Sequence, residues 1–154
     1  KGVYEFLAPA EYHNRKVVHP YIAICIDVSP SSYGNGIFSQ VLSSLESLLD
    51  YIPSPELTHI AIFTFDQAIT YFQAPQDLSK ELKVTAVNDV DDYCVPFPPS
   101  VLFSNLAEQK ERLIYLIQRI QKYYDTLYQA QTQPKTFSPG TCFGAAVNNC
   151  GRML

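Results

Sequence analysis

Residues 21–27 read Tyr-Ile-Ala-Ile-Cys-Ile-Asp, a nearly continuous apolar run that ends on the carboxylate of Asp27. The chain then breaks into Pro, Ser and Gly over residues 29–36. A short apolar run bounded by turn residues is typical of a strand that is buried on both faces of a sheet. The sequence therefore predicts a buried strand at residues 21–27 and a loop at residues 29–36.

Three amphipathic or helix-compatible segments follow this strand. Residues 37–49 show helical spacing of apolar side chains and end before Pro53. A long helix is predicted after Asn105, whose spacing from Glu108 resembles a capping box. A last helix is expected over residues 138–150. The apolar face of the helix at residues 37–49 is predicted to contain Ile37, Phe38, Val41, Leu42, Leu45, Leu48 and Leu49. The apolar face of the helix after Asn105 is predicted to contain Leu106, Leu113, Ile114, Leu116, Ile117, Ile120, Tyr124 and Leu127.

The remaining strands are predicted between these helices. Residues 58–65 and 68–72 are rich in β-forming side chains and lie close together in the chain, so we expect an antiparallel hairpin. Residues 82–88 predict a further strand. The acidic, proline-rich stretch 88–99 excludes a regular helix or an interior strand, because proline lacks the N–H that either would need. We therefore expect an ordered loop or a sheet edge there.

The order of these elements predicts an α/β fold. We expect a mostly parallel, Rossmann-like sheet with an antiparallel edge hairpin and helices on both faces. Residues 1–20 are expected to be an extended segment that leads into the domain at residues 21–154. The last predicted helix should be followed by another parallel strand, so we expect an incomplete domain, a fragment of a longer protein.

Composition narrows the range of functions. The chain has 154 residues, 47% of them hydrophobic, which suits one core. Its net charge of -4 argues against binding nucleic acid through phosphates. Charged residues make up only 17%, while 11 Tyr and 9 Phe supply apolar contact area, so we expect part of the surface to contact another protein. The 4 cysteines are too far apart for paired zinc knuckles and are expected to be reduced, buried thiols.

The sharpest chemical pattern is D-x-S-x-S, formed by Asp27, Ser29 and Ser31 at the carboxyl end of the first strand. Ligand sites collect at such strand ends, and these oxygens are of the kind that Mg²⁺ prefers. The pattern resembles the metal-dependent adhesion site of von Willebrand A domains, and Thr141 lies at about the place where that resemblance implies a further ligand. The alternative, which we favour, is that Asp27 and the serines make local hydrogen bonds to the backbone of the following turn.

No pattern points to an enzyme. The three histidines have no Ser, Cys or second His at a catalytic spacing, and Gly34 and Gly36 lack the rest of a phosphate-binding loop. The acidic cluster Asp89, Asp91 and Asp92 lacks the glycine and distal Glu of an EF-hand loop. We therefore rank an α/β hydrolase-like or nucleotide-using enzyme below a binding protein.

Four ordered blocks carry a resemblance to a known family. They are residues 4–12 (YEFLAPAEY, with Arg15 soon after), 24–29 (ICIDVS), 60–66 (IAIFTFD) and 88–96 (NDVDDYCVP). In this order and spacing the chain resembles the trunk region of the Sec24 family, the cargo-adaptor subunit of the COPII vesicle coat. The resemblance implies a von Willebrand A-like trunk domain, of which this chain would be the N-terminal part.

The resemblance also implies a function. A Sec24 subunit pairs through its trunk with the Sec23 subunit on the cytosolic face of the endoplasmic reticulum membrane, and it recruits cargo and SNARE proteins by sorting signals for transport to the Golgi. Zinc is implied in a finger upstream of the trunk, and no cofactor in these residues. Family members generally lack a working metal site in the trunk, so Asp27, Ser29 and Ser31 are expected to be vestigial and no metal is expected there.

Two places are candidate partner-binding sites. In the proline-rich loop, Tyr93 and Phe97 would lose little entropy on docking, although both could instead hold the loop on its own core. Arg15 and Lys16 are candidates for acidic sorting signals or acidic lipid headgroups, with peripheral membrane contact of about 1 kcal/mol for each charge.

Overall fold

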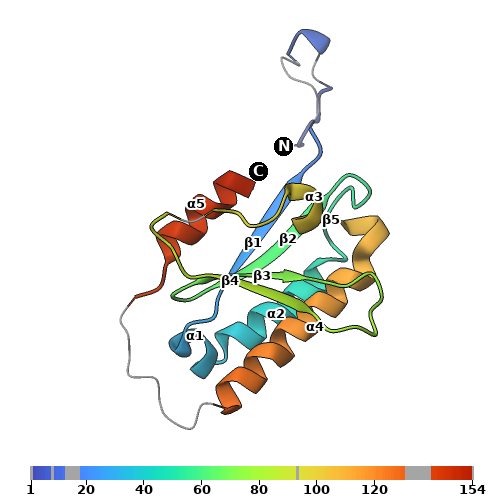
Figure 1. The fold of residues 1–154 in the computed structure, drawn as a ribbon. Helices are drawn as coiled ribbons and strands as arrows, with labels where there is room; N and C mark the ends of the chain where they lie inside the picture. The colour runs from blue at the N-terminus through green and yellow to red at the C-terminus, as the bar shows by residue number, and fades with distance from the viewer. Residues whose placement is uncertain (1, 8, 13–17, 93, 131–139, 154) are drawn as a thin grey trace.

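The computed structural model describes residues 2–7, 9–12, 18–92, 94–130 and 140–153. These residues form a mixed sheet with helices on both faces (Figure 1). The elements in chain order are the 3-10 turn Ala10–Tyr12, β1 (Tyr21–Asp27), α1 (Pro30–Gly34), α2 (Ile37–Leu48), β2 (His59–Phe65), β3 (Ile69–Gln73), β4 (Lys83–Val87), α3 (Pro99–Leu102), β5 (Ser104–Asn105), α4 (Leu106–Ala130) and α5 (Phe143–Met153).

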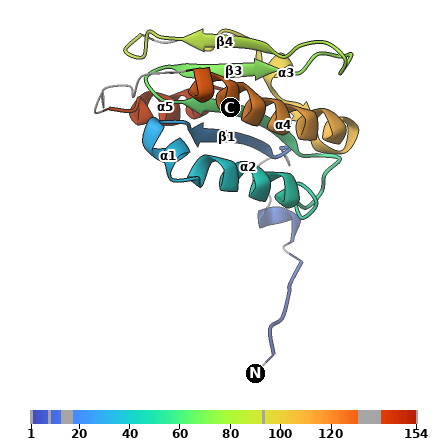
Figure 2. The same ribbon diagram turned by 90° about the horizontal axis from the view of Figure 1, so that it is seen from below.

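The sheet has the order β1-β2-β3-β4, and the short β5 also pairs with β2. β1 and β2 are parallel, from Tyr21 opposite His59 to Asp27 opposite Phe65. β1 thus occupies one edge of β2 along its whole length, so β3 and β5 must share the other edge. There β3 pairs with Phe63–Phe65 and β5 with His59–Ile60. Figure 2 shows β3 and β4 at one side of the sheet.

This arrangement confirms the predicted α/β fold and hairpin and corrects one detail. We expected a mostly parallel sheet, but β2–β3, β2–β5 and β3–β4 are all antiparallel. A parallel connection needs a crossover of roughly a dozen residues or more. The links at residues 66–68 and 74–82 are too short for one, so β3 and β4 fold back beside β2.

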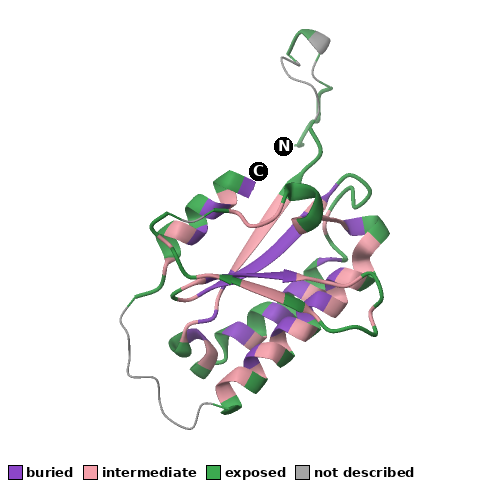
Figure 3. Cartoon of the chain, in the orientation of Figure 1, coloured by how far each residue is buried: buried purple, intermediate pink, exposed green. Residues whose placement is uncertain are grey.

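Helices α2 and α4 cover one face of the sheet, and α3 and α5 cover the other (Figures 1 and 3). Alternate side chains of β1 contribute to the cores on the two faces of the sheet, because successive side chains of a strand point to opposite faces. Its isoleucines pack on the α2 and α4 side, and Ala23 and Cys25 pack on the α5 side. The larger core is built around Phe38, Leu42, Ile60, Leu106, Leu113, Ile117 and Ile120, and the smaller around Phe63, Phe65, Ile69, Tyr71 and Ala146.

The predicted loop at residues 29–36 is wrong in part, because it contains the short helix α1. Ser29 caps this helix and Pro30 occupies its first turn, where the missing N–H of proline costs no hydrogen bond. The prediction for α2 is also too broad. Its buried face contains Phe38, Leu42, Leu45 and Leu49, whereas Ile37, Val41 and Leu48 are exposed, because they lie too far round the helix to reach the sheet.

Helix α4 begins as predicted. The backbone N–H of Glu108 donates to Asn105 Oδ1 at 3.1 Å, which is the capping bond expected at this helix start. Six of the predicted apolar residues are buried, but Ile114 and Leu127 are only partly so. Gln109 departs from helical geometry at φ -125° and ψ 23°, which kinks the first turns.

Residues 88–98 form irregular backbone where they are described, as the prolines predict, and α3 begins at Pro99. Residues 2–7 and 9–12 lie away from the sheet (Figure 1). In the described part of the chain, no helix combines the length and apolar character needed to cross a membrane.

Candidate functional site

The carboxyl ends of β1 and β2 meet at one edge of the sheet, and the predicted D-x-S-x-S residues lie there. The two strands are in register up to Asp27 and Phe65, and Val28 N–H continues the pairing by donating to the Phe65 carbonyl at 3.0 Å. Asp27 therefore lies beside the strand end that precedes Asp66. Two carboxylates from different strands are brought to the same edge.

Local hydrogen bonds engage both Asp27 and Ser29. The Ser29 N–H donates to Asp27 Oδ1 at 2.8 Å, and Ser29 Oγ accepts from the Ser32 N–H at 3.3 Å. Ser31 is exposed, and its carbonyl accepts from the Asn35 N–H at 3.1 Å. The side-chain bonds of Asp27 and Ser29 are those of the alternative that we favoured from the sequence, since they order the start of α1, whereas the Ser31 bond is made by its backbone.

Asp66 and the segment before α5 complete this edge. Asp66 Oδ1 accepts from the Ala68 N–H at 3.0 Å and shapes the turn between β2 and β3. The Asp66 carbonyl accepts from the Cys142 N–H at 2.7 Å, which brings the exposed Thr141 to this end of the sheet. Within the described residues, no group of three or more His, Cys, Asp or Glu side chains is placed to hold a metal ion.

Two stacked tyrosines tie α4 to this edge. The Tyr128 hydroxyl donates to the Val28 carbonyl at 2.6 Å, and its ring stacks on Tyr33 with centroids 4.1 Å apart. Tyr33 in turn donates to Asp125 Oδ1 at 2.8 Å. Burial, and then the nearby carboxylates of Asp66 and Asp27, raise the pKa of Tyr128 to about 12. Both phenols are therefore hydrogen-bond donors at neutral pH and suit a structural tie better than acid–base chemistry.

Sequence reasoning missed this tie. The predicted stripe of the long helix ended at Leu127, and neither Tyr33 nor Tyr128 was singled out. One signal was present: Tyr128 follows Tyr124 by four residues, which places both on one side of α4.

The proline-rich loop holds the predicted partner-binding residue Phe97. This ring is partly buried and makes a T-shaped contact with Tyr71, with centroids 6.3 Å apart. Val95 packs beside it on the smaller core. The Phe97 ring thus holds the loop on the smaller core. Binding of a partner protein by Phe97 remains a prediction. Tyr93, Arg15 and Lys16 lie outside the described residues.

The cysteines are free thiols, as predicted, but they are not all buried. Cys94 is exposed, while Cys25 in β1, Cys142 just before α5 and Cys150 in α5 are partly buried against the smaller core. Burial, and then the neighbouring Cys25, raise the pKa of Cys150 to about 11. Burial also raises the pKa of Cys142. At neutral pH these two groups are thiols and not the thiolates that attack substrates or bind metals.

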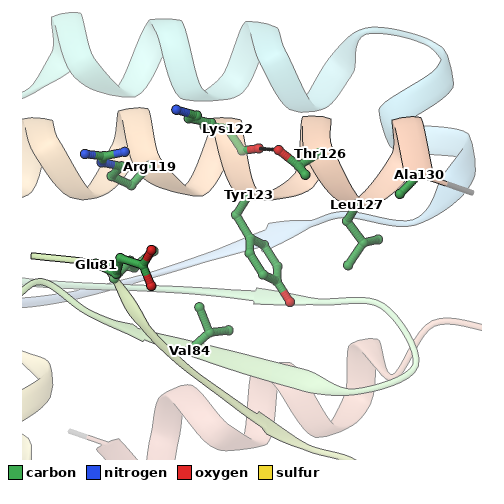
Figure 4. Close-up of a pocket in the computed structure, with 9 residues that line it drawn as sticks. Glu81, Val84, Arg119, Lys122, Tyr123, Thr126, Leu127 and Ala130 are labelled. Atoms are coloured by element: carbon green, nitrogen blue, oxygen red, sulfur yellow. Dashed lines mark hydrogen bonds between the residues drawn. The ribbon is translucent and has the colours of Figure 1, made fainter.

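A groove runs between α4 and the edge strand β4 (Figure 4). It has a volume of about 440 Å³, and Val84, Tyr123 and Leu127 form its apolar floor. Glu81 lies on one rim, and Arg119 and Lys122 lie on the other. The groove offers apolar contact area and contains no pairing of a nucleophile with a base.

Comparison with known proteins identifies the family. A family model described as "Sec23/Sec24 trunk domain" matches residues 19–154. The chain belongs to the Sec23/Sec24 trunk domain family. This trunk segment is 31% identical to protein transport protein Sec24A of Mus musculus over 83% of the chain and 12% of that protein. It is also 31% identical to protein transport protein SEC24 of Eremothecium gossypii over 96% of the chain and 16% of that protein.

A solved structure agrees with this assignment at the level of fold. The crystal structure of the human COPII-coat protein Sec24c superposes with a TM-score of 0.74 at 21% identity, over 97% of this chain and 19% of that one. The chain thus spans less than a fifth of the length of these relatives. The trunk segment brings Asp27 and Ser29 together at one sheet edge and places Phe97 on the smaller core.

Proposed function

We propose that this trunk segment is part of a protein-binding subunit of the COPII vesicle coat, which pairs with the Sec23 subunit and selects cargo for transport from the endoplasmic reticulum to the Golgi. The observation that carries the proposal is the match of the Sec23/Sec24 trunk model to residues 19–154. The likeness in fold to a COPII-coat protein supports it.

We propose that the trunk segment binds other proteins and does not catalyse a reaction. The polar groups at the carboxyl ends of β1 and β2 have partners inside the protein: Asp27 bonds to the Ser29 backbone, and Tyr128 bonds to the Val28 carbonyl. A docking subunit needs a stiff sheet that presents loops, edges and apolar grooves to other proteins. The groove beside β4 and the loop around Phe97 are surfaces of this kind.

The proposed partners follow from the same assignment. They are the Sec23 subunit, and cargo and SNARE proteins with their sorting signals, at the cytosolic face of the endoplasmic reticulum membrane with peripheral membrane contact. Nucleic acid is not proposed, because the net charge is -4. We propose no metal in this segment, and zinc only in an upstream finger of the longer protein.

Affinity purification tests the proposal. A tagged protein that contains residues 1–154 is purified from cells and its partners are identified by mass spectrometry. We expect the Sec23 subunit to be recovered in near-stoichiometric amount. Recovery of the folded protein without any Sec23 subunit would count against the proposal.

A further inference from the structure

A second cavity, of about 450 Å³, lies where β3 and β5 separate along the edge of β2. β3 pairs with the Phe63–Phe65 end of β2, and β5 pairs with the His59–Ile60 end. Because the two strands diverge from this common edge, a gap opens between them. Side chains of β3, the loop after it, β4, α3, β5 and α4 line the gap, including those of Gln73, Gln76, Lys83, Ser100, Ser104, Gln109 and Arg112.

The walls of this cavity are positively charged. Arg112 and Lys83 line it, and none of the described lining residues is Asp or Glu. Three glutamine amides and two serine hydroxyls add further groups able to donate hydrogen bonds. The cavity is therefore positively charged in a chain whose net charge is -4. A partly enclosed cationic cavity focuses the field on small anions.

Arg112 is fixed at the wall of the cavity. Its Nη2 donates to the Ala74 carbonyl at 2.8 Å, which holds the guanidinium in place. Its Nε is buried and has no hydrogen-bond partner within the described part of the chain. The guanidinium is thus held against the cavity wall with one of its N–H donors unpaired. Guanidinium groups match carboxylate and phosphate oxygens with paired N–H donors.

We propose that this cavity binds a small oxyanion, a carboxylate or a phosphate, with Arg112 as its main ligand and the exposed Lys83 at its mouth. The cavity volume is within the range of small-ligand sites. Ile60, Phe72, Leu113 and Leu116 form an apolar base that suits the carbon skeleton of an organic anion. This inference is independent of the coat function, since it uses only the cavity and its charges.

Isothermal titration calorimetry on the full chain tests the proposal. The probes are succinate, inorganic phosphate and the neutral analogue succinamide, at constant ionic strength. We expect succinate or phosphate to bind and succinamide not to bind. R112Q should weaken the binding about tenfold or more, because it removes a charge-assisted hydrogen-bond donor. K83M should weaken it several-fold. K110Q is the matched control on the same helix: Lys110 lies outside the cavity and pairs with Asp50, so its loss should leave the binding of these anions unchanged.

The titrations distinguish a carboxylate site, a phosphate site and the absence of a site. Binding of succinate alone identifies a carboxylate site, and binding of phosphate alone identifies a phosphate site. The proposal is overturned if neither anion binds at about 10 mM. Binding that is equal in R112Q and the unmodified chain, or equal for succinamide, would also overturn it, because it would show an adventitious ion only. A thermal melt checks that R112Q folds. If R112Q does not fold, K83M decides the question, since Lys83 is exposed.

Discussion

At the scale of single residues, two phenols join α4 to the sheet. Tyr124 is buried, and its hydroxyl lies 2.6 Å from Thr64 Oγ1. Tyr128 reaches the Val28 carbonyl at the same distance, 2.6 Å. Both hydroxyls keep their protons in the folded state, because burial raises the pKa of each to about 12. A buried phenolate would lose its hydration without a compensating positive charge.

Stability should therefore fall at alkaline pH. In the unfolded chain a tyrosine ionises near its ordinary pKa of about 10, whereas Tyr124 in the folded chain does so near 12. The stabilisation from the protonated phenol is complete below pH 10 and is lost as the pH rises through 12. For Tyr124 alone we expect the free energy of unfolding to fall by about 2 kcal/mol between these values.

Urea unfolding at a series of pH values, with ultraviolet absorbance to follow tyrosinate formation, measures this loss. Tyr124→Phe removes the titrating group, so its profile should be flatter above pH 10. An equally steep fall in that variant would contradict the assignment to Tyr124.

Hydrogen bonds between residues that are close in the sequence could be predicted, whereas those between distant residues could not. The bonds of Asp27 and Ser29 reach only two or three residues along the chain, so the motif itself indicated them. The Tyr128 bond joins groups 100 residues apart, and Arg112 meets Ala74 across 38. Such contacts depend on how α4 lies across the sheet, which local patterns do not encode.

At the scale of elements, hydrophobic pattern and turn residues located β1 to β4 and the long helices α2 and α4, but not the two-residue strand β5. They could not set the rotation of α2, which leaves Ile37, Val41 and Leu48 exposed. They also missed α1, because a five-residue helix within a Pro and Ser loop has no periodicity of its own. The sharing of one β2 edge by β3 and β5, and hence the cavity between them, is a property of pairing that no single segment shows.

The loop before α3 offers an element-scale prediction. Phe97→Ala should lower the free energy of unfolding by about 1–2 kcal/mol, less than for a fully buried Phe, because the ring is only partly buried. Chemical denaturation measures the change. Val101→Ala, at a side chain that is 49% exposed in α3, is the control and should change stability by less than about 0.5 kcal/mol. Unchanged stability in Phe97→Ala would show that the ring does not anchor the loop.

The outer edge of β1 supplies another prediction. In the described residues β1 pairs with β2 alone, so its second edge has no strand partner. An apolar strand with a free edge is a template for association with another chain. We expect the isolated chain to self-associate or to be marginally stable.

Sedimentation velocity over a wide range of protein concentration measures this association. High salt is the control, because pairing of strand edges should persist when charge interactions are screened. A monomer with a high melting temperature would contradict the prediction.

At the scale of the whole molecule, the structure is a mixed sheet clamped between two helical layers. Its surface features are a groove, an irregular loop and a free strand edge, which suit protein contact better than the handling of a reacting group. The account predicts that Mg²⁺ plays no part. Thermal melts with and without millimolar Mg²⁺ should coincide, both for the unmodified chain and for Asp27→Asn. A metal-dependent rise in melting temperature that Asp27→Asn abolishes would restore the Mg²⁺ site.

The most direct measurement is a binding titration between the purified Sec23 subunit and a purified protein that contains residues 1–154, with the stoichiometry determined by sedimentation. Our account predicts a one-to-one complex that forms without Mg²⁺. A folded protein that forms no complex with the Sec23 subunit, or that binds a different ligand only through Mg²⁺ at Asp27, would contradict it.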